Sequence, residues 1–157
     1  MSFGKMVSEA KTFGDRNYLK PGNYLLELQV ARTNDGLKGL FGIAEFKVIE
    51  SEATEAGVAP SPKGLIVSYS EGDVRDVKKG PAKLGRFKKM LSAIAGEELD
   101  GSGVDDAVGK YNPLAFIRVR CMAYSKVLAA DPAKGYAGTT LTNFTWTSVE
   151  EIGRAHV

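Results

Sequence analysis

The chain has 157 residues, of which 43% are hydrophobic and 25% charged, and its formal net charge is +2 at pH 7. This length predicts one domain with short arms, and the ordinary apolar content excludes general disorder. No apolar run approaches the roughly 20 residues that a bilayer-spanning helix needs, and the first residues lack the apolar core of a signal peptide. We therefore expect a cytoplasmic protein without a membrane partner.

The residues on which most enzymes depend are scarce. Cys121 is the only cysteine and His156 the only histidine, so the chain can form neither an internal disulfide nor a Cys/His zinc site. Neither the Gly-x-x-x-x-Gly-Lys-Ser/Thr loop nor the Gly-x-Gly-x-x-Gly turn occurs. Carboxylates lie in pairs such as Glu97-Glu98, which are typical of solvated surfaces. We expect no catalytic residue, no metal site and no cofactor, and thus not an enzyme.

Two runs near the start of the chain predict a long antiparallel hairpin. Residues 24–30 and 40–50 both alternate apolar and polar side chains, as half-buried strands do. Between them, the Asp35-Gly36 step is a strong short-range signal for a hairpin turn. The side chains expected in the core are Tyr24, Leu26, Leu28 and Val30 on the first strand and Ala44, Phe46 and Val48 on the second.

The remaining elements follow a loop at 51–64 that is rich in Gly and Pro. A helix is predicted to begin at Pro81 and to end at Gly96, with an apolar stripe on one face. The stripe consists of Leu84, Phe87, Leu91 and Ile94. Further strands are predicted at 65–70, at 114–124 and at about 140–149, with a Gly-rich connector after the helix.

Three strands, a helix and two strands follow one another in an OB-fold, a small, partly open Greek-key barrel. We therefore predict a mainly β protein, a five-stranded OB-fold with one amphipathic helix between strands 3 and 4, although other five-stranded arrangements share this order. The expected organisation is an N-terminal arm at 1–20, the OB-fold domain at 21–150 and a C-terminal tail at 151–157.

Six cations and no acid lie between residues 78 and 89, although the whole chain is only +2. They are Lys78, Lys79, Lys83, Arg86, Lys88 and Lys89. Such a stretch attracts a phosphate backbone. An amphipathic helix also needs a polar face toward water, and we give this interpretation at least equal weight.

The outer face of the fourth strand carries a more specific pattern. Strict alternation projects Phe116, Arg118, Arg120, Met122 and Tyr124 together. Arginines pair with phosphates, and aromatic rings are platforms for unpaired bases, although Phe116 and Met122 would also suit packing beneath an arm or tail. Cations and aromatic residues of the second strand, and of the loops that border the groove of an OB-fold, complete the predicted site. The predicted nucleic-acid-binding residues are Arg32, Lys38, Phe41, Lys47, Phe116, Arg118, Arg120, Tyr124, Lys126, Lys134 and Tyr136.

Two single residues require separate interpretation. Trp146 is a candidate for base stacking, but a lone tryptophan in a small barrel is more often core, and Phe144 at the same parity favours the core. The sequence leaves this choice open. Cys121 shares the parity of Val119, and we expect it to be a buried, inert thiol.

Several short motifs support a family resemblance. They are Pro21-Gly22-Asn23-Tyr24, Gly42-Ile43-Ala44-Glu45-Phe46-Lys47-Val48, Glu50-Ser51, Leu84-Gly85-Arg86-Phe87 with Leu91, Val108-Gly109-Lys110, and Asn143-Phe144 with Trp146. Together they resemble small phage-encoded OB-fold single-stranded DNA-binding proteins from replication and recombination gene cassettes. The resemblance covers about residues 20–150 and implies sequence-tolerant binding of unpaired DNA. Bacterial single-strand binding proteins recruit enzymes through a strongly acidic tail, whereas residues 150–157 hold only two acids, so we do not expect recruitment of this type.

We therefore expect a sequence-nonspecific single-stranded DNA-binding protein that acts in phage DNA replication or recombination, in the host cytoplasm. Single-stranded DNA is the expected partner, while other replication or recombination proteins and further copies of the chain are additional candidates. The main alternative is a structural or assembly protein of a phage that uses the barrel as a scaffold and exposed apolar residues as a protein interface. A second alternative is a small carboxylate-dependent nuclease.

Overall fold

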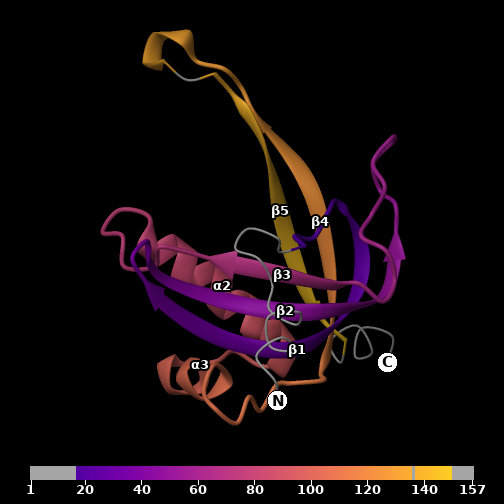
Figure 1. Cartoon of the computed structure of the whole chain (residues 1–157), viewed down its shortest axis with the longest axis vertical. Coiled ribbons are helices and arrows are strands. Elements are labelled where there is room, and N and C mark those ends of the chain that lie inside the picture. Colours follow the sequence, from indigo (N-terminus) through magenta and orange to yellow (C-terminus); the bar gives the residue numbers. More distant parts are fainter. Residues whose placement is uncertain (1–16, 136, 150–157) are drawn as a thin grey trace, which may run out of the picture.

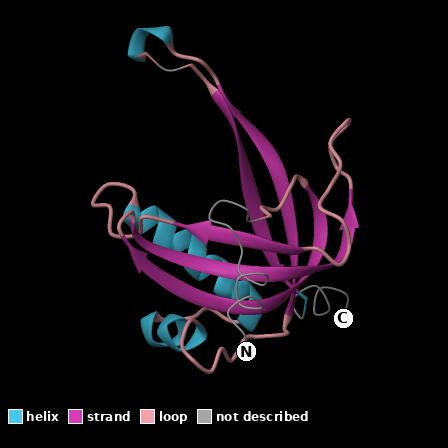
Figure 2. Ribbon diagram, viewed as in Figure 1, coloured by secondary structure: helices cyan, strands magenta, loops and turns pink. Residues whose placement is uncertain are grey.

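The computed structural model describes residues 17–135 and 137–149, and this part of the chain is mainly β (Figures 1 and 2). Its elements in chain order are β1 (Gly22–Gly36), β2 (Gly39–Glu52), β3 (Ile66–Glu71), α2 (Gly80–Ala95), α3 (Gly101–Ala107), β4 (Arg118–Leu128), the 3-10 turn η1 (Pro132–Lys134) and β5 (Thr139–Ser148). The five predicted strands, and a helix between the third and the fourth, are confirmed.

The five strands form a single antiparallel sheet in the order β3-β2-β1-β4-β5. β3 and β5 are its two edges, and no strand pairing joins them within the described residues, so the sheet does not close into a barrel. Pairing of β4 with β1 ends at Ala123. Beyond that residue, in the part of the chain that the structure describes, β4 pairs only with β5, and the two strands form a hairpin arm (residues 124–135 and 137–143) that projects from the molecule (Figure 1).

Residues just before β1 pack against the sheet. Tyr18 forms a parallel bridge with Ser68 of β3, and the Ser68 N–H donates to the Asn17 carbonyl at 2.7 Å. Leu19 is 5% exposed and belongs to the core. The last four residues of the predicted arm therefore belong to the packed domain. Its first sixteen residues, like the predicted tail, lie outside the described residues.

The first hairpin is longer than predicted, and its core positions shift within β1. Gly36 pairs with Gly39, so only two residues lie between the paired positions of the strands. Between Leu28 and Val30 the register slips by one residue, which is a β-bulge. A bulge reverses the alternation of side chains along the strand. Ala31 is therefore fully buried, while Val30, which was expected in the core, is only half-buried.

α2 begins and ends close to the predicted positions, but its buried stripe differs. Pro81 lies in the first turn, and Gly96 ends the helix in a left-handed conformation with φ of 76°. The buried side chains are Phe87, Met90, Leu91 and Ile94, whereas Leu84 is 50% exposed. At helical spacing Met90 lies on the same side of the helix as Phe87 and Ile94. The buried stripe therefore includes Met90, which was not among the predicted residues. No helix in the described residues is long and apolar enough to cross a membrane.

The segment between α2 and β4 differs from the prediction at two points. Its Gly-rich connector contains a second helix, α3, because the Asp100 carboxylate caps the first turn by accepting the Gly103 N–H at 2.7 Å. β4 begins at Arg118 rather than at residue 114, because Phe116 has a left-handed φ of 70° that a strand does not accommodate.

An asparagine takes the place of strand pairing before β4. The Asn112 Oδ1 accepts the N–H of Ala31 at 2.6 Å, and its Nδ2 donates to the carbonyl of the same residue at 2.6 Å. The backbone of β1 therefore continues to be paired at Ala31, beyond the last residue that β4 reaches.

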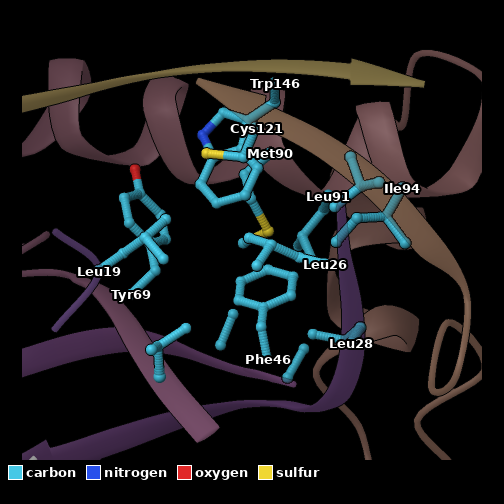
Figure 3. Packing of buried hydrophobic residues seen from close by; sticks show 14 of the residues in the cluster. Leu19, Leu26, Leu28, Phe46, Tyr69, Met90, Leu91, Ile94, Cys121 and Trp146 are labelled. Atoms are coloured by element: carbon cyan, nitrogen blue, oxygen red, sulfur yellow. The ribbon is translucent and has the colours of Figure 1, made fainter. Parts of the chain in front are cut away.

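The hydrophobic core lies between α2 and the face of the sheet that α2 covers (Figure 3). It includes Leu26 and Leu28 of β1, Phe46 of β2, Tyr69 of β3, Met90 and Leu91 of α2, Cys121 of β4 and Trp146 of β5. Cys121 is 1% exposed, as predicted, and burial raises the pKa of its thiol, which keeps the group neutral.

Candidate nucleic-acid interface

The predicted side chains of the fourth strand lie on one face of β4. Arg118, Arg120, Met122 and Tyr124 alternate with the buried residues Val119, Cys121 and Ala123. The side of the sheet on which Arg118, Arg120 and Met122 lie, opposite the core, is termed the outer face below. Phe116 precedes the strand, and its left-handed backbone takes it out of the alternation.

Each predicted arginine within the sheet is paired with a glutamate. The pairs are Arg118 Nε with Glu27 Oε2 at 3.4 Å, Arg120 Nη1 with Glu50 Oε2 at 3.8 Å, and Arg32 Nη2 with Glu45 Oε1 at 4.0 Å. Exposed pairs of this kind contribute little to stability. The glutamates nevertheless compensate the positive charges of the arginines, to which a phosphate would bind. Lys47 is exposed, and it also lies opposite an acid, Glu27, in the strand register.

The two predicted stacking phenylalanines differ in accessibility. Phe116 is 69% exposed. Phe41 is half-buried, and its ring packs so closely against Gly72 that a Cβ at that position would overlap it. Phe41 therefore packs on the segment that leaves β3, and only part of its ring is open to a ligand.

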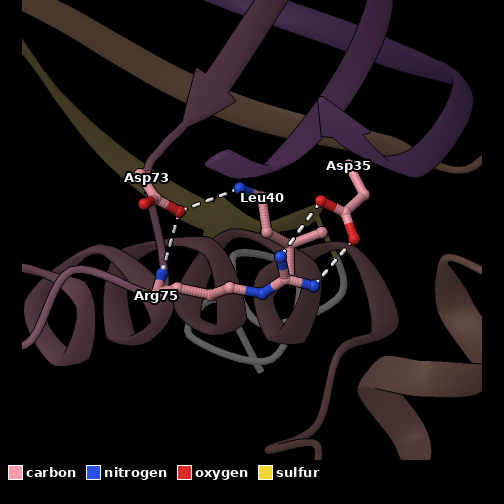
Figure 4. A network of polar contacts seen from close by, with 4 residues as sticks. All are labelled: Asp35, Leu40, Asp73 and Arg75. Atoms are coloured by element: carbon pink, nitrogen blue, oxygen red, sulfur yellow. Dashed lines mark hydrogen bonds and ion pairs between the residues drawn. The ribbon is translucent and has the colours of Figure 1, made fainter. Parts of the chain in front are cut away.

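A polar network ties the β1–β2 turn, which carries Lys38, to the segment between β3 and α2 (Figure 4). Asp73 Oδ1 accepts the backbone N–H of Arg75 at 3.1 Å and that of Leu40 at 2.8 Å. The Arg75 guanidinium donates to both carboxylate oxygens of Asp35, at 3.0 and 2.8 Å. The two backbone hydrogen bonds, led by that from Arg75, lower the pKa of the Asp73 carboxyl.

The other predicted binding residues that the structure describes lie along the hairpin arm. Tyr124 is 40% exposed near the base of the arm, and Lys126 follows it on β4. Lys134 lies in η1 at the tip (Figure 1), and Tyr136 lies outside the described residues. Tyr124 and Lys126 thus lie near the sheet, whereas Lys134 lies at the far end of the arm.

A cleft of about 610 Å³ is bordered by both edges of the sheet, β3 and β5. The side chains around it come from four elements, of which β3 and α2 are distant in the sequence from β4 and β5. They include Tyr69 and Glu71 of β3, Arg86 and Lys89 of α2, Tyr124 and Lys126 of β4, and Asn143, Phe144 and Trp146 of β5. Among these, only Tyr124 and Lys126 belong to the predicted set.

A cluster of aromatic rings connects this cleft to the core. Tyr69 meets Phe144 and Trp146 edge-on, with ring centroids 5.1 Å apart in both pairs. Trp146 also forms stacked contacts with Phe144 at 6.0 Å and with Phe46 at 5.4 Å. Trp146 is only 8% exposed, so it is a core residue whose accessible part lines the cleft, while Phe144 is half-buried.

Three cations border the cleft. Arg86 donates from Nε and Nη2 to the two carboxylate oxygens of Glu71, at 2.7 and 3.1 Å, and this bonding raises the pKa of its guanidinium. Lys89 and Lys126 are exposed, and neither has a carboxylate within 4.0 Å in the part of the chain that the structure describes. The cleft therefore holds two lysine charges that have no ion-pair partner among the described residues.

This arrangement suits a ligand that combines flat rings with anionic groups. Aromatic side chains bind bases by stacking, and lysines attract phosphates as point charges. The amide of Asn143, which also lines the cleft, is able both to donate and to accept hydrogen bonds.

The sequence indicates the parts of this site but not their proximity. The cations of the helix and the shared parity of Phe144 and Trp146 are both visible in it. The cleft exists because the chain folds the polar edge of α2 between β3 and β5, and no local signal indicates that contact.

Within the described residues, no three potential metal ligands lie close enough to hold an ion. Neither the family models nor the curated proteins with which the chain was compared match it. The function must therefore be inferred from the site.

Proposed function

We propose that the protein binds single-stranded DNA without sequence specificity and coats it during phage DNA replication or recombination. The observation that carries this proposal is the cleft, where the exposed Tyr124 and the half-buried Phe144, which packs on the buried rings of Tyr69 and Trp146, lie beside three cations. Stacking tolerates any sequence because every base has a π face, and cations that contact the backbone do not distinguish bases. Each stacking contact in comparable proteins is worth roughly 1–3 kcal/mol, so a site that gathers several is needed.

We interpret the fold as an OB-like barrel that is open along one seam. The order β3-β2-β1-β4-β5, with a helix between β3 and β4, is the order expected for a five-stranded Greek-key barrel whose third and fifth strands are parted. In OB-folds the connection between strands 4 and 5 borders the oligonucleotide. Here that connection belongs to the hairpin arm, which contributes Tyr124 and Lys126 to the cleft.

Fluorescence anisotropy of a labelled thymine oligonucleotide, titrated with the protein at low and high salt, tests the proposal. We expect binding to the single strand that weakens as salt rises, because bound phosphates release counterions, and little binding to a duplex of equal length. Absence of binding at low salt would contradict the proposal. A sample with magnesium distinguishes coating, which leaves the oligonucleotide intact, from cleavage by a nuclease.

The cleft can be separated from the outer face by paired substitutions. Lys89→Gln combined with Lys126→Gln should weaken binding and reduce the slope of log K against log salt by about 1.4, from two contacts of about 0.7 each. The matched control is Arg118→Gln combined with Arg120→Gln, which removes the same charge from the outer face. It should have the smaller effect because both arginines are paired with glutamates. A larger loss in the control would place the interface on the outer face instead.

The exposed apolar residues favour a second candidate, a structural or assembly protein of a phage. Phe116, Met122 and Val127 are 69%, 46% and 73% exposed. Exposed apolar side chains of this size suit a protein interface when they are contiguous. In that case no oligonucleotide should bind at low salt, and Met122→Ser combined with Val127→Ser should abolish association with a protein partner.

A further inference from the structure

We propose that Glu71 is a positioning residue of the cleft, whose carboxylate orients both a phosphate-binding cation, Arg86, and the aromatic wall formed by Tyr69. The inference rests on the proposed function and deepens it, since it names what organises the site. A carboxylate beside a phosphate site would ordinarily be unfavourable, and its presence there requires an explanation.

Glu71 is the last residue of β3, and its side chain is only 11% exposed. Its Oε1 accepts the Tyr69 hydroxyl at 2.7 Å and the Arg86 Nε at 2.7 Å, and its Oε2 accepts Arg86 Nη2 at 3.1 Å. One nearly buried carboxylate thus holds two side chains from different elements, β3 and α2. All three residues line the cleft.

The bonds to Glu71 leave most of the Arg86 guanidinium available. The group has five N–H donors in one plane, of which two face the carboxylate and three remain. The Arg86 side chain is 56% exposed. Two parallel bonds fix the plane of the guanidinium, so the remaining donors keep one direction and a phosphate binds them with less loss of side-chain freedom.

The third bond acts on the aromatic cluster. The Tyr69 ring meets Phe144 and Trp146 edge-on at 5.1 Å, and its hydroxyl is held by Glu71. Loss of that bond would leave the ring held by packing alone, with a nearly buried hydroxyl that has lost its acceptor. The position of Glu71 therefore couples the orientation of the cation to that of the aromatic wall.

Charge counting and positioning predict opposite effects of removing this carboxylate. If the charge of Glu71 only repels phosphate, Glu71→Gln should strengthen DNA binding. If Glu71 positions its neighbours, the same substitution should weaken binding, because an amide has a single oxygen to accept bonds from Arg86 and Tyr69. The sign of the change decides between the two.

The test measures anisotropy of a labelled thymine oligonucleotide with the wild type, Glu71→Gln and the control Glu45→Gln. We expect Glu71→Gln to weaken binding about fivefold, the equivalent of one net hydrogen bond. Glu45→Gln removes the same charge from a pair with Arg32 on the outer face and should bind as the wild type or slightly more tightly. Equal or tighter binding by Glu71→Gln would overturn the proposal.

A double-mutant cycle separates positioning from general loss of structure. Arg86→Lys should weaken binding in the wild type but have a smaller effect in Glu71→Gln, where the orientation is already lost. Equal effects in both backgrounds would overturn the positioning role. If Glu71→Gln does not fold, Tyr69→Phe, which removes only the bond between Tyr69 and Glu71, tests the aromatic half of the proposal: it should weaken binding, and unchanged binding would overturn the positioning of Tyr69 by Glu71. Failure of the wild type to bind would instead overturn the proposed function itself.

Discussion

At the residue scale, single carboxylates organise the connections around β3. Glu71 joins the end of β3 to α2, and two residues later Asp73 accepts backbone N–H groups from Leu40 and Arg75. Asp73 thereby joins the start of β2 to the segment that leads into α2 (Figure 4). Backbone donors of irregular segments have no strand or helix partner, so side-chain acceptors satisfy them.

Asp73→Asn should reduce stability more at neutral pH than in acid. The two hydrogen bonds lower the pKa of this carboxyl from its ordinary 3.8, so its charged form stabilises the folded state above that pH. This stability is lost as the pH falls through the lowered pKa. Urea unfolding should therefore show a difference in unfolding free energy between wild type and variant that is largest at neutral pH and shrinks below pH 3.8.

The control for this measurement is Asp105→Asn, because Asp105 is exposed on α3. It should change the unfolding free energy little at any pH. A difference for Asp73→Asn that stays constant from neutral to acidic pH would show that the charge of Asp73 has no stabilising role.

At the element scale, a glycine within α2 and the glycine that caps its C-terminal end have different conformational requirements. Gly96 ends the helix with φ of 76°, and its N–H donates to the Ser92 carbonyl at 2.9 Å. Gly85 lies within the helix, is exposed, and has no atom within 4 Å of the place where a Cβ would be. A Cβ disfavours the left-handed conformation, whereas alanine is preferred over glycine within a helix.

Alanine at these two positions should therefore change stability in opposite directions. Gly96→Ala should lower the unfolding free energy by about 1 kcal/mol, and Gly85→Ala should raise it by about 0.5–1 kcal/mol. Urea unfolding of both variants checks this expectation. Two changes of the same sign would mean that contacts, rather than backbone conformation, determine the effect of these glycines.

At the scale of the whole molecule, the hairpin arm is structurally separate from the core. Among the described residues, its strands pair only with one another beyond Ala123, and none between 127 and 140 belongs to the core cluster. Near its base, the Ser125 N–H donates to the Glu55 carboxylate at 3.2 Å and so attaches the arm to the β2–β3 loop. The part of the arm that lines the cleft lies at its base as well.

Shortening the arm should therefore preserve the fold. Lys126 and Leu141 face one another in the register, so residues 127–140 can be replaced by an Asn-Gly turn. We expect the stability to change by less than about 1 kcal/mol, or roughly 2–4 °C in the unfolding midpoint. Oligonucleotide binding should persist with at most a modest loss, because the cleft residues remain. Loss of all binding in a folded variant would place the DNA site at the tip of the arm.

Much of the fold could be predicted because its signals are local. Alternation indicated the strands, Pro81 and Gly96 marked the ends of α2, and the hairpin formed next to the predicted turn. The bulge that places Ala31 rather than Val30 in the core could not be predicted, since it depends on how β1 and β2 pair. The start of β4 was placed too early because alternation continues through Phe116, whose backbone leaves the strand conformation.

The sequence by itself determined which segments become strands and helices, because periodicity and turn residues act over a few neighbouring positions. Only the tertiary structure decided which charges remain available. Pairing of the strands brings Arg118 and Arg120 close to glutamates, while Lys89 and Lys126 lie beside a cleft and have no such partners in residues 17–135 and 137–149. Charge compensation and proximity depend on distances between segments far apart in the chain, and those distances are set by register and packing rather than by local sequence.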